Sequence, residues 1–136
     1  MRKQKVFLFD APLLLLGLSV SVCGCGVSQL ESINISPDTA TAQDSASGKV
    51  QFTATGTYTD GRTVSPLTAF WGFHAPWIEI ADPGGVSVDS NGLAQCTTFK
   101  GTISIIAIAA KNPDTPLSAM TMTTPVVSAT AHLTCQ

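Results

Sequence analysis

The sequence predicts an all-β protein, a sandwich of antiparallel strands, and three observations support this fold class. Residues 50–59 alternate strictly, with apolar or small residues at even positions and polar residues, mostly Thr, between them. A period of two places these sets on opposite faces of a strand. Thr, Ser, Ala, Val and Ile dominate the composition, with Gly and Pro spaced between the runs, as in an all-β domain with many turns. Asp60-Gly61 and Asn91-Gly92 are dipeptides typical of tight turns between antiparallel strands.

The same signals predict the other strands in chain order. The segment 30–37 alternates around two Ile residues and ends in Pro37, which suits a first, edge strand. The segment 102–110 is apolar on both parities, so we expect a central strand covered on both faces. Further strands are expected near 39–43, at 69–74 with a core Trp71, at 77–81, as a short pair within 86–96, at 120–124 as an edge hairpin arm, and at 126–135.

Residues 1–24 have the organisation of a secretory signal peptide. Three basic residues are followed by a short apolar run and then by small residues, the three regions of such a signal. Asp10 and Pro12 interrupt the run and leave about ten clean apolar positions, too few for the roughly 20 that span a bilayer. We therefore favour a cleaved signal over an uncleaved membrane anchor.

The end of this segment, Val22-Cys23-Gly24-Cys25, resembles the lipobox of bacterial lipoproteins. The resemblance implies cleavage before Cys25, a diacylglyceryl thioether on its sulfur and acylation of the new N-terminus, with residues 25–29 as a short tether. More than one acyl chain makes a stable membrane anchor. Gly26 in place of Asp implies the outer membrane or the cell surface, with a periplasm-facing orientation left open. Ordinary signal-peptidase cleavage is the alternative.

The charge that remains after processing argues against nucleic acid as a partner. The chain has seven basic and nine acidic residues. Removing residues 1–24 takes away Arg2, Lys3, Lys5 and Asp10, which leaves four basic and eight acidic residues and a net charge of −4. Nucleic-acid binding depends on a basic surface, and no basic cluster survives in the mature sequence.

Several short motifs follow one another at distinctive spacing in the mature chain. They are Ile33-Asn34-Ile35-Ser36-Pro37, the alternating stretch 50–61, Leu67-Thr68 ahead of Trp71, Asn91-Gly92-Leu93-Ala94, and Gly101 with Ile103 and Ile105. In this order they resemble a bacterial immunoglobulin-like domain of group 2, the module repeated in intimin- and invasin-type surface proteins. The resemblance implies an Ig-like Greek-key β-sandwich of about seven to eight antiparallel strands over residues 30–136. Residues 70–76 depart from the Ser-rich turn usual there, and the module stands alone rather than in an array.

Four cysteines form two pairs of different meaning. Cys23 and Cys25 belong to the signal, whereas Cys96 and Cys135 remain in the mature chain. In an exported, disulfide-permissive compartment we favour a Cys96–Cys135 disulfide over free thiols. Such a bridge would stabilise the fold by about 4 kcal/mol in the chain-entropy model. A metal site is disfavoured because only two His residues could join the thiolates, at spacings unlike those of metal ligands.

Catalysis finds little support, so we expect no enzyme, no catalytic residue, no metal and no cofactor. Serine chemistry needs a base and an orienting acid. The sequence holds no nucleophile-elbow motif, and His74 and His132 are interpreted as structural or exposed residues. The acidic residues of the central region lie near expected turns, where Asp has a conformational reason to be. The stretch 89–92 begins like a calcium loop but lacks the later Glu, so it is interpreted as a hairpin turn.

The remaining candidate site is aromatic. Five of the nine aromatic residues lie near one region: Tyr58, Phe70, Trp71, Phe73 and Trp77. Core packing is the favoured interpretation, with Trp71 and Tyr58 inside. The alternative is a ligand platform formed by Phe70, Phe73 and Trp77, in which Trp77, beside Pro76 in a loop, is expected to be the most exposed.

These features together predict a lipid-anchored cell-envelope protein that presents one sandwich domain in a structural, adhesive or protein-docking role. We expect a monomer that meets the membrane through the lipid on Cys25 and has an envelope protein or a glycan as partner. A carbohydrate-binding module that uses the aromatic residues around Trp77 is the alternative. A hydrolase dependent on His74 or His132 is a third, disfavoured hypothesis.

Overall fold

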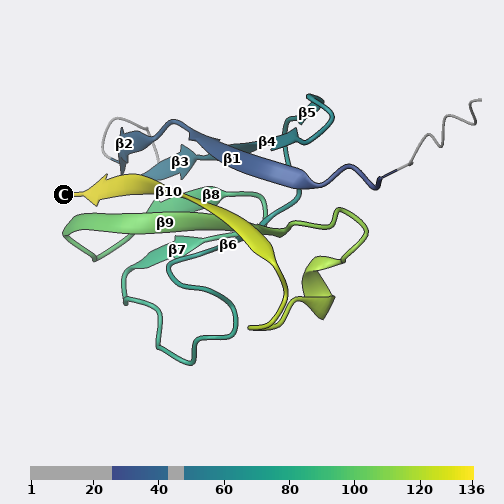
Figure 1. The fold of residues 1–136 in the computed structure, drawn as a ribbon. Helices are drawn as coiled ribbons and strands as arrows, with labels where there is room; N and C mark the ends of the chain where they lie inside the picture. The colour runs from purple at the N-terminus through teal and green to yellow at the C-terminus, as the bar shows by residue number, and fades with distance from the viewer. Residues whose placement is uncertain (1–25, 43–47) are drawn as a thin grey trace, which may run out of the picture.

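The computed structural model describes residues 26–42 and 48–136, and almost all of their regular structure is β-strand (Figure 1). The signal peptide and Cys25 lie outside the described residues. The strands are β1 (Leu30–Ser36), β2 (Thr39–Thr41), β3 (Lys49–Gln51), β4 (Thr53–Tyr58), β5 (Thr63–Val64), β6 (Phe70–Gly72), β7 (Val86–Val88), β8 (Leu93–Cys96), β9 (Gly101–Ala110) and β10 (Val126–Cys135), with a 3-10 turn η2 (Leu117–Ala119). The predicted all-β sandwich is confirmed.

The strands form two layers. In the first layer, β3 and β4 continue one another as a long strand interrupted only at Phe52; β3 pairs with β8 and β8 with β7, while β4 pairs with β1 and β5. The second layer has the order β2-β10-β9-β6, in which β2 runs parallel to β10 and the other pairs are antiparallel. The described residues hold ten strands rather than seven or eight, because the long strand is divided and β2 and β5 are very short.

The alternation that predicts the long strand is reproduced in the burial of its side chains. Phe52, Ala54, Gly56 and Tyr58 are buried, whereas the Thr residues between them are partly exposed. β1 lies at the edge of its sheet, as predicted for a strand that ends before Pro37.

The core lies between the layers and depends on the long β9–β10 pair. Every residue from Gly101 to Ala110 has a partner in β10, and Ile105, Ala107 and Leu133 are fully buried in the main hydrophobic cluster. β9 also pairs with β6 on its other side. Ile108 is buried as well, yet it lies outside the main cluster, so the opposite face of β9 is covered too. The prediction of a central strand is confirmed.

Two predicted strands are wrong. Residues 77–81 alternate in sequence but form a loop, in which Ile78 and Ile80 face solvent. Ile80 N donates to Ile78 O at 3.0 Å, so the chain turns back on itself, and Pro76 and Pro83 on either side cannot donate to a ladder.

The expected hairpin arm at 120–124 is a turn. Thr124 N donates to Thr121 O at 3.0 Å, and Thr121 N donates to Thr124 Oγ1 at 2.9 Å. Thr hydroxyls that bind the nearby backbone offer it an alternative to a sheet ladder, which explains the miss.

Candidate functional site

The aromatic cluster divides into core residues and residues of a loop. Tyr58 and Trp71 are 7% and 8% exposed and belong to the main cluster, as the core interpretation predicts. Phe70, Phe73 and Trp77, the expected platform, are all half-buried. Trp77, the aromatic residue expected to be most exposed, is half-buried like the other two.

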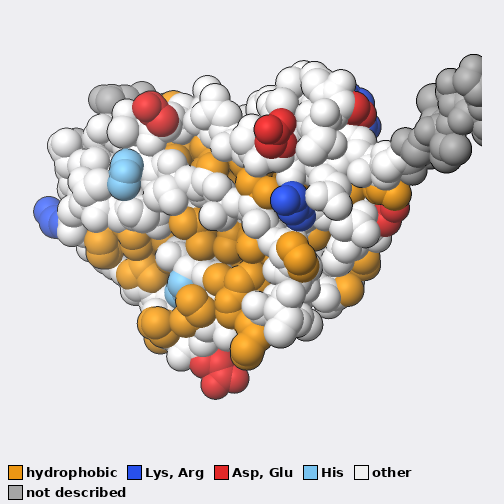
Figure 2. Space-filling view, in the orientation of Figure 1, with side chains coloured by type: hydrophobic (Ala, Val, Ile, Leu, Met, Phe, Trp, Pro, Cys, Tyr) orange, Lys and Arg blue, Asp and Glu red, His pale blue; other side chains and the backbone are white. Residues whose placement is uncertain are grey.

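The large hydrophobic side chains that are most exposed on this face are not aromatic. Figure 2 shows hydrophobic side chains gathered over β9 and the loops below it. Ile78, Ile80 and Met122 belong to those loops and are 40%, 64% and 74% exposed. The exposed hydrophobic surface near the predicted aromatic platform is thus formed by Ile and Met side chains.

His74 links the two arms of the loop 73–85. Its Nε2 lies 3.1 Å from Asp82 Oδ1, and its Nδ1 lies 3.1 Å from Ala75 O. The pair becomes ionic only when the imidazole is protonated. Within residues 26–42 and 48–136, no group of three or more His, Cys, Asp or Glu side chains could hold a metal ion, so the contact is best explained as a brace across the loop.

His132 has a Ser neighbour but not the arrangement of a catalytic triad. Its Nδ1 lies 3.4 Å from Ser104 Oγ across the β9–β10 pair, on the exposed face. Among the described residues, Asp82 is the acidic residue that forms an ion pair with a His, and that His is His74. His132 therefore lacks an orienting acid of the kind that activates a Ser within the part of the chain that the structure describes.

Cys96 and Cys135 are joined by a disulfide, the pairing that the sequence favours. Their Cα atoms are 5.8 Å apart, and 39 positions separate them in sequence. Cys96 ends β8 in the first layer, and Cys135 ends β10 in the second. The bridge therefore ties the two layers covalently at one end of the sandwich.

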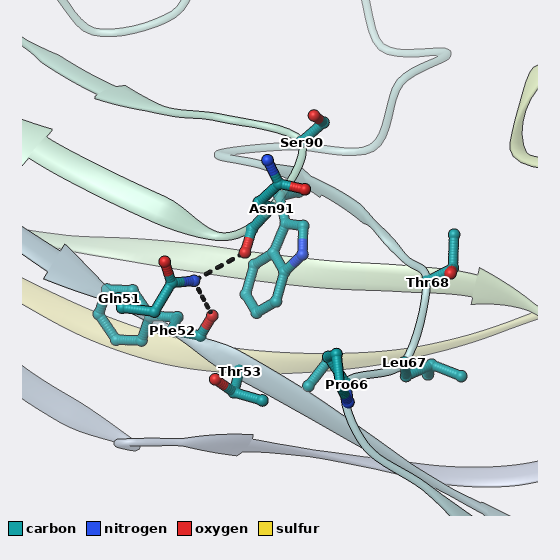
Figure 3. Close-up of a pocket in the computed structure, with 10 residues that line it drawn as sticks. Gln51, Phe52, Thr53, Pro66, Leu67, Thr68, Ser90 and Asn91 are labelled. Carbon is teal, nitrogen blue, oxygen red and sulfur yellow. Dashed lines mark hydrogen bonds between the residues drawn. The ribbon is translucent and has the colours of Figure 1, made fainter.

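A groove opens in the first layer where the long strand changes partners (Figure 3). In an extended strand, backbone groups two residues apart point to the same side. Phe52 N donates to Gly92 O at 2.9 Å, and Ala54 O accepts from Leu67 N at 2.8 Å. The turn before β8 and the segment after β5 therefore lie on the same side of the strand. The gap between them encloses about 410 Å³.

Ten residues from four stretches of the chain line this groove. They are Gln51, Phe52, Thr53, Ala54, Pro66, Leu67, Thr68, Trp71, Ser90 and Asn91. Trp71 reaches it from β6 of the second layer, and the other nine belong to the long strand and to the two segments beside it. The second layer thus supplies an aromatic side chain to a groove in the first layer.

Gln51 bridges the groove at the interruption of the long strand. Its Nε2 donates to Phe52 O at 2.8 Å and to Asn91 O at 2.7 Å, the two dashed lines in Figure 3. These bonds supply a partner to a strand carbonyl just beyond the β3–β8 ladder, whose last pair is Gln51 and Leu93. They also fix the turn to the strand. The amide oxygen of Gln51 keeps its acceptor capacity.

The turn that forms one wall of the groove is held by Asp89. Its Oδ1 accepts from Asn91 N at 2.8 Å and from Leu93 N at 2.9 Å. The predicted hairpin turn between β7 and β8 is confirmed. The side chain of Asn91 makes none of these bonds and lies on the rim in Figure 3.

Gly92 allows this turn to approach Trp71 closely. Its φ is +80°, and a Cβ there would lie 2.5 Å from Phe52 O and 2.9 Å from Trp71 Cζ2. Any other residue would be strained in φ and would press on the indole. A backbone of this shape at the groove therefore requires glycine.

The groove offers unused hydrogen-bonding groups and no charge. Among the described residues, nothing accepts from the indole N–H of Trp71, and the hydroxyls of Thr53, Thr68 and Ser90 and the amide of Asn91 have no protein partner. The ten lining residues are all uncharged. Sequence analysis missed this site, because Gln51 follows the polar alternation of its strand like any solvent-facing residue.

A charged turn lies near the start of β1. Asp60 Oδ1 accepts from Arg62 N at 2.9 Å, and this bond holds the pKa of Asp60 below its ordinary value of 3.8. The Arg62 guanidinium lies 4.5 Å from the centre of the Tyr58 ring, within the range of a cation–π contact. The contacts order the β4–β5 turn.

No protein-family model matches the chain, and no curated protein is significantly similar to it. In the part of the chain that the structure describes, no helix has both the length and the apolar character needed to cross a membrane. The disulfide, the neutral groove and the N-terminal sequence are therefore the observations from which a function can be argued.

Proposed function

We propose that this protein is a lipid-anchored component of the bacterial cell envelope that presents a single Ig-like sandwich in a structural, adhesive or protein-docking role. The observation that carries the proposal is the lipobox-like Cys25 placed a few residues ahead of a disulfide-bridged sandwich. Structural disulfides belong to exported proteins and are rare in reducing compartments. The Cys96–Cys135 bridge therefore supports the export that the signal-like segment predicts.

The tether between the lipid and the sandwich would be very short. Gln29 already pairs with the end of β4, because Thr59 N donates to Gln29 O at 2.9 Å and Gln29 N donates to Thr59 Oγ1 at 3.1 Å. Residues 26–28 are left to connect the lipidated Cys25 to the domain, and they span roughly 10 Å when extended. The sandwich would sit close against the bilayer as a rigid module.

A docking role also fits the resemblance to group 2 immunoglobulin-like modules of surface proteins. The partner would be another envelope component, met by a monomer of this protein. A hydrolase is disfavoured because, among the described residues, His132 has no orienting acid and His74 has no hydroxyl or thiol partner.

The decisive experiment compares two cysteine variants in the native membrane. Cys25→Ser should move the protein from the membrane to the soluble fraction and abolish lipid labelling, because the thioether can no longer form. Cys23→Ser, two positions earlier, is the matched control and should leave both unchanged. Intact mass should begin at Cys25 plus lipid, with two thiols that react with alkylating agents only after reduction. An unlipidated mass, or equal behaviour of the two variants, would overturn the proposal.

A further inference from the structure

We propose that the groove beside Trp71 is a binding site for a neutral saccharide unit. Its volume of about 410 Å³ falls within the roughly 300–1,000 Å³ of small-molecule sites. This inference is independent of the lipid anchor, because it depends only on residues of the described sandwich.

The charge of the lining selects against ionic ligands. All ten residues that line the groove are uncharged. Specific sites for anions and cations use opposite charges or aligned backbone dipoles, and a charged group placed here would lose hydration without compensation. The ligand is therefore a neutral one.

The free polar groups match a polyhydroxylated ligand. The indole N–H of Trp71 donates, the Gln51 amide oxygen accepts, and the Asn91 amide and the hydroxyls of Thr53 and Thr68 can do both. A sugar presents hydroxyls that each donate and accept, in alternation with C–H groups. Trp71, Pro66 and Leu67 supply apolar surface for those C–H groups, so the mixture of both kinds of lining suits a sugar ring.

The groove is also formed before any ligand arrives. Gln51 holds the turn to the strand through two bonds shorter than 2.9 Å, and Asp89 fixes the turn itself. Gln51 Nε2 and Asp89 Oδ1 are therefore occupied by bonds within the protein. The side chain of Asn91 and the hydroxyls of Thr53, Thr68 and Ser90 have no partner among the described residues and remain for the ligand. Such preorganisation reduces the entropic cost of binding.

The test uses Trp71 as its own reporter. The chain has two Trp residues, so Trp77→Phe in the intact mature protein leaves the fluorescence of Trp71 alone. Cellobiose, lactose, maltotriose and diacetylchitobiose are titrated to about 10 mM, above a weak Kd of about 1 mM. We expect a saturable change in Trp71 emission with at least one of them.

Two variants locate the binding. Asn91→Ala removes one hydrogen-bonding amide without touching the turn and should raise Kd by roughly 3- to 10-fold. Thr68→Phe, at an exposed position beside the groove, should fill the groove and abolish the response without adding a second tryptophan. Asn34→Ala, on the exposed face of β1, is the matched control and should bind normally.

Three outcomes would overturn the proposal. They are the lack of any saturable response from a folded protein, a response unchanged by Asn91→Ala and Thr68→Phe, and equal or tighter binding of a uronic-acid disaccharide. The second outcome would place the ligand elsewhere, for example near the loop 73–85.

Discussion

The two Trp residues lie in two regions that are assembled in opposite ways. Trp77 belongs to the loop 73–85, where aromatic and aliphatic residues are dense along the sequence, yet the exposed large hydrophobic residues of this loop are Ile78 and Ile80. Trp71 lines a groove whose other residues come from three separate stretches of the chain. Hydrophobic residues that are close together in sequence thus form a loop, whereas the candidate site is formed by residues that are distant in sequence and close in space.

The largest expected difference between the two regions is in the stability lost when each Trp is replaced by Ala. Trp71→Ala should lower the free energy of unfolding by about 3–5 kcal/mol, because it empties a buried position between the layers. Trp77→Ala should cost no more than about 1–2 kcal/mol, since its side chain stays partly solvated in the folded state. Urea unfolding followed by far-UV circular dichroism measures both. Equal losses would show that the loop is as much a part of the core as Trp71 is.

The disulfide supports the region of the groove more directly than the loop. β8 begins after the groove turn and ends at Cys96, so the bridge to Cys135 fixes the far end of the same strand. Replacing both residues by Ala should cost about 4 kcal/mol for a closed segment of 39 positions. Native-state hydrogen exchange should show β8 and its turn losing protection before β6. A loss of stability below about 1 kcal/mol would mean that the bridge constrains little.

Replacing one glycine from each region by Ala should change the free energy of unfolding by a smaller amount. Gly92→Ala should cost about 2–3 kcal/mol, because φ is +80° and the new Cβ would press on Phe52 O and Trp71. Gly84 in the loop has nothing within 4 Å of its Cβ position. Gly84→Ala should therefore be neutral, or slightly stabilising through the unfolded state. The urea midpoints of the two variants give the comparison, and a tolerated Gly92→Ala would contradict the close approach of turn and indole.

The strands that the sequence predicts correctly are those whose hydrophobic pattern reflects burial of one face or of both faces. The segments 50–58 and 102–110 fall in this class, and both are strands of the sandwich. Residues 77–81 carry the same alternation without a partner strand, because two Pro residues isolate them. A period of two is therefore necessary for a half-buried strand but does not show that a neighbour is available.

The candidate site was less predictable than the fold. The Cys96–Cys135 pair could be anticipated from the two cysteines that remain after the signal-like segment of the sequence. The groove could not, because it exists only where the turn before β8, the segment after β5 and Trp71 meet beside the long strand. None of the residues that line the groove is unusual in its own segment of the sequence, and only the pairing of β3 with β8 brings Asn91 to Gln51.

Asp60 lies in neither region and should give the smallest effect. Its pKa is lowered in the folded protein by the Arg62 N–H bond, so its ionised form favours folding. That contribution is present above the unfolded pKa of about 3.9 and is lost as the pH falls through the lower folded value. Asp60→Asn should therefore lower the urea midpoint slightly at pH 6 and not at all near pH 2, because Asn can still accept from Arg62 N. A difference that persists at the acid end would mean that Asp60 acts through the shape of the turn rather than through its charge.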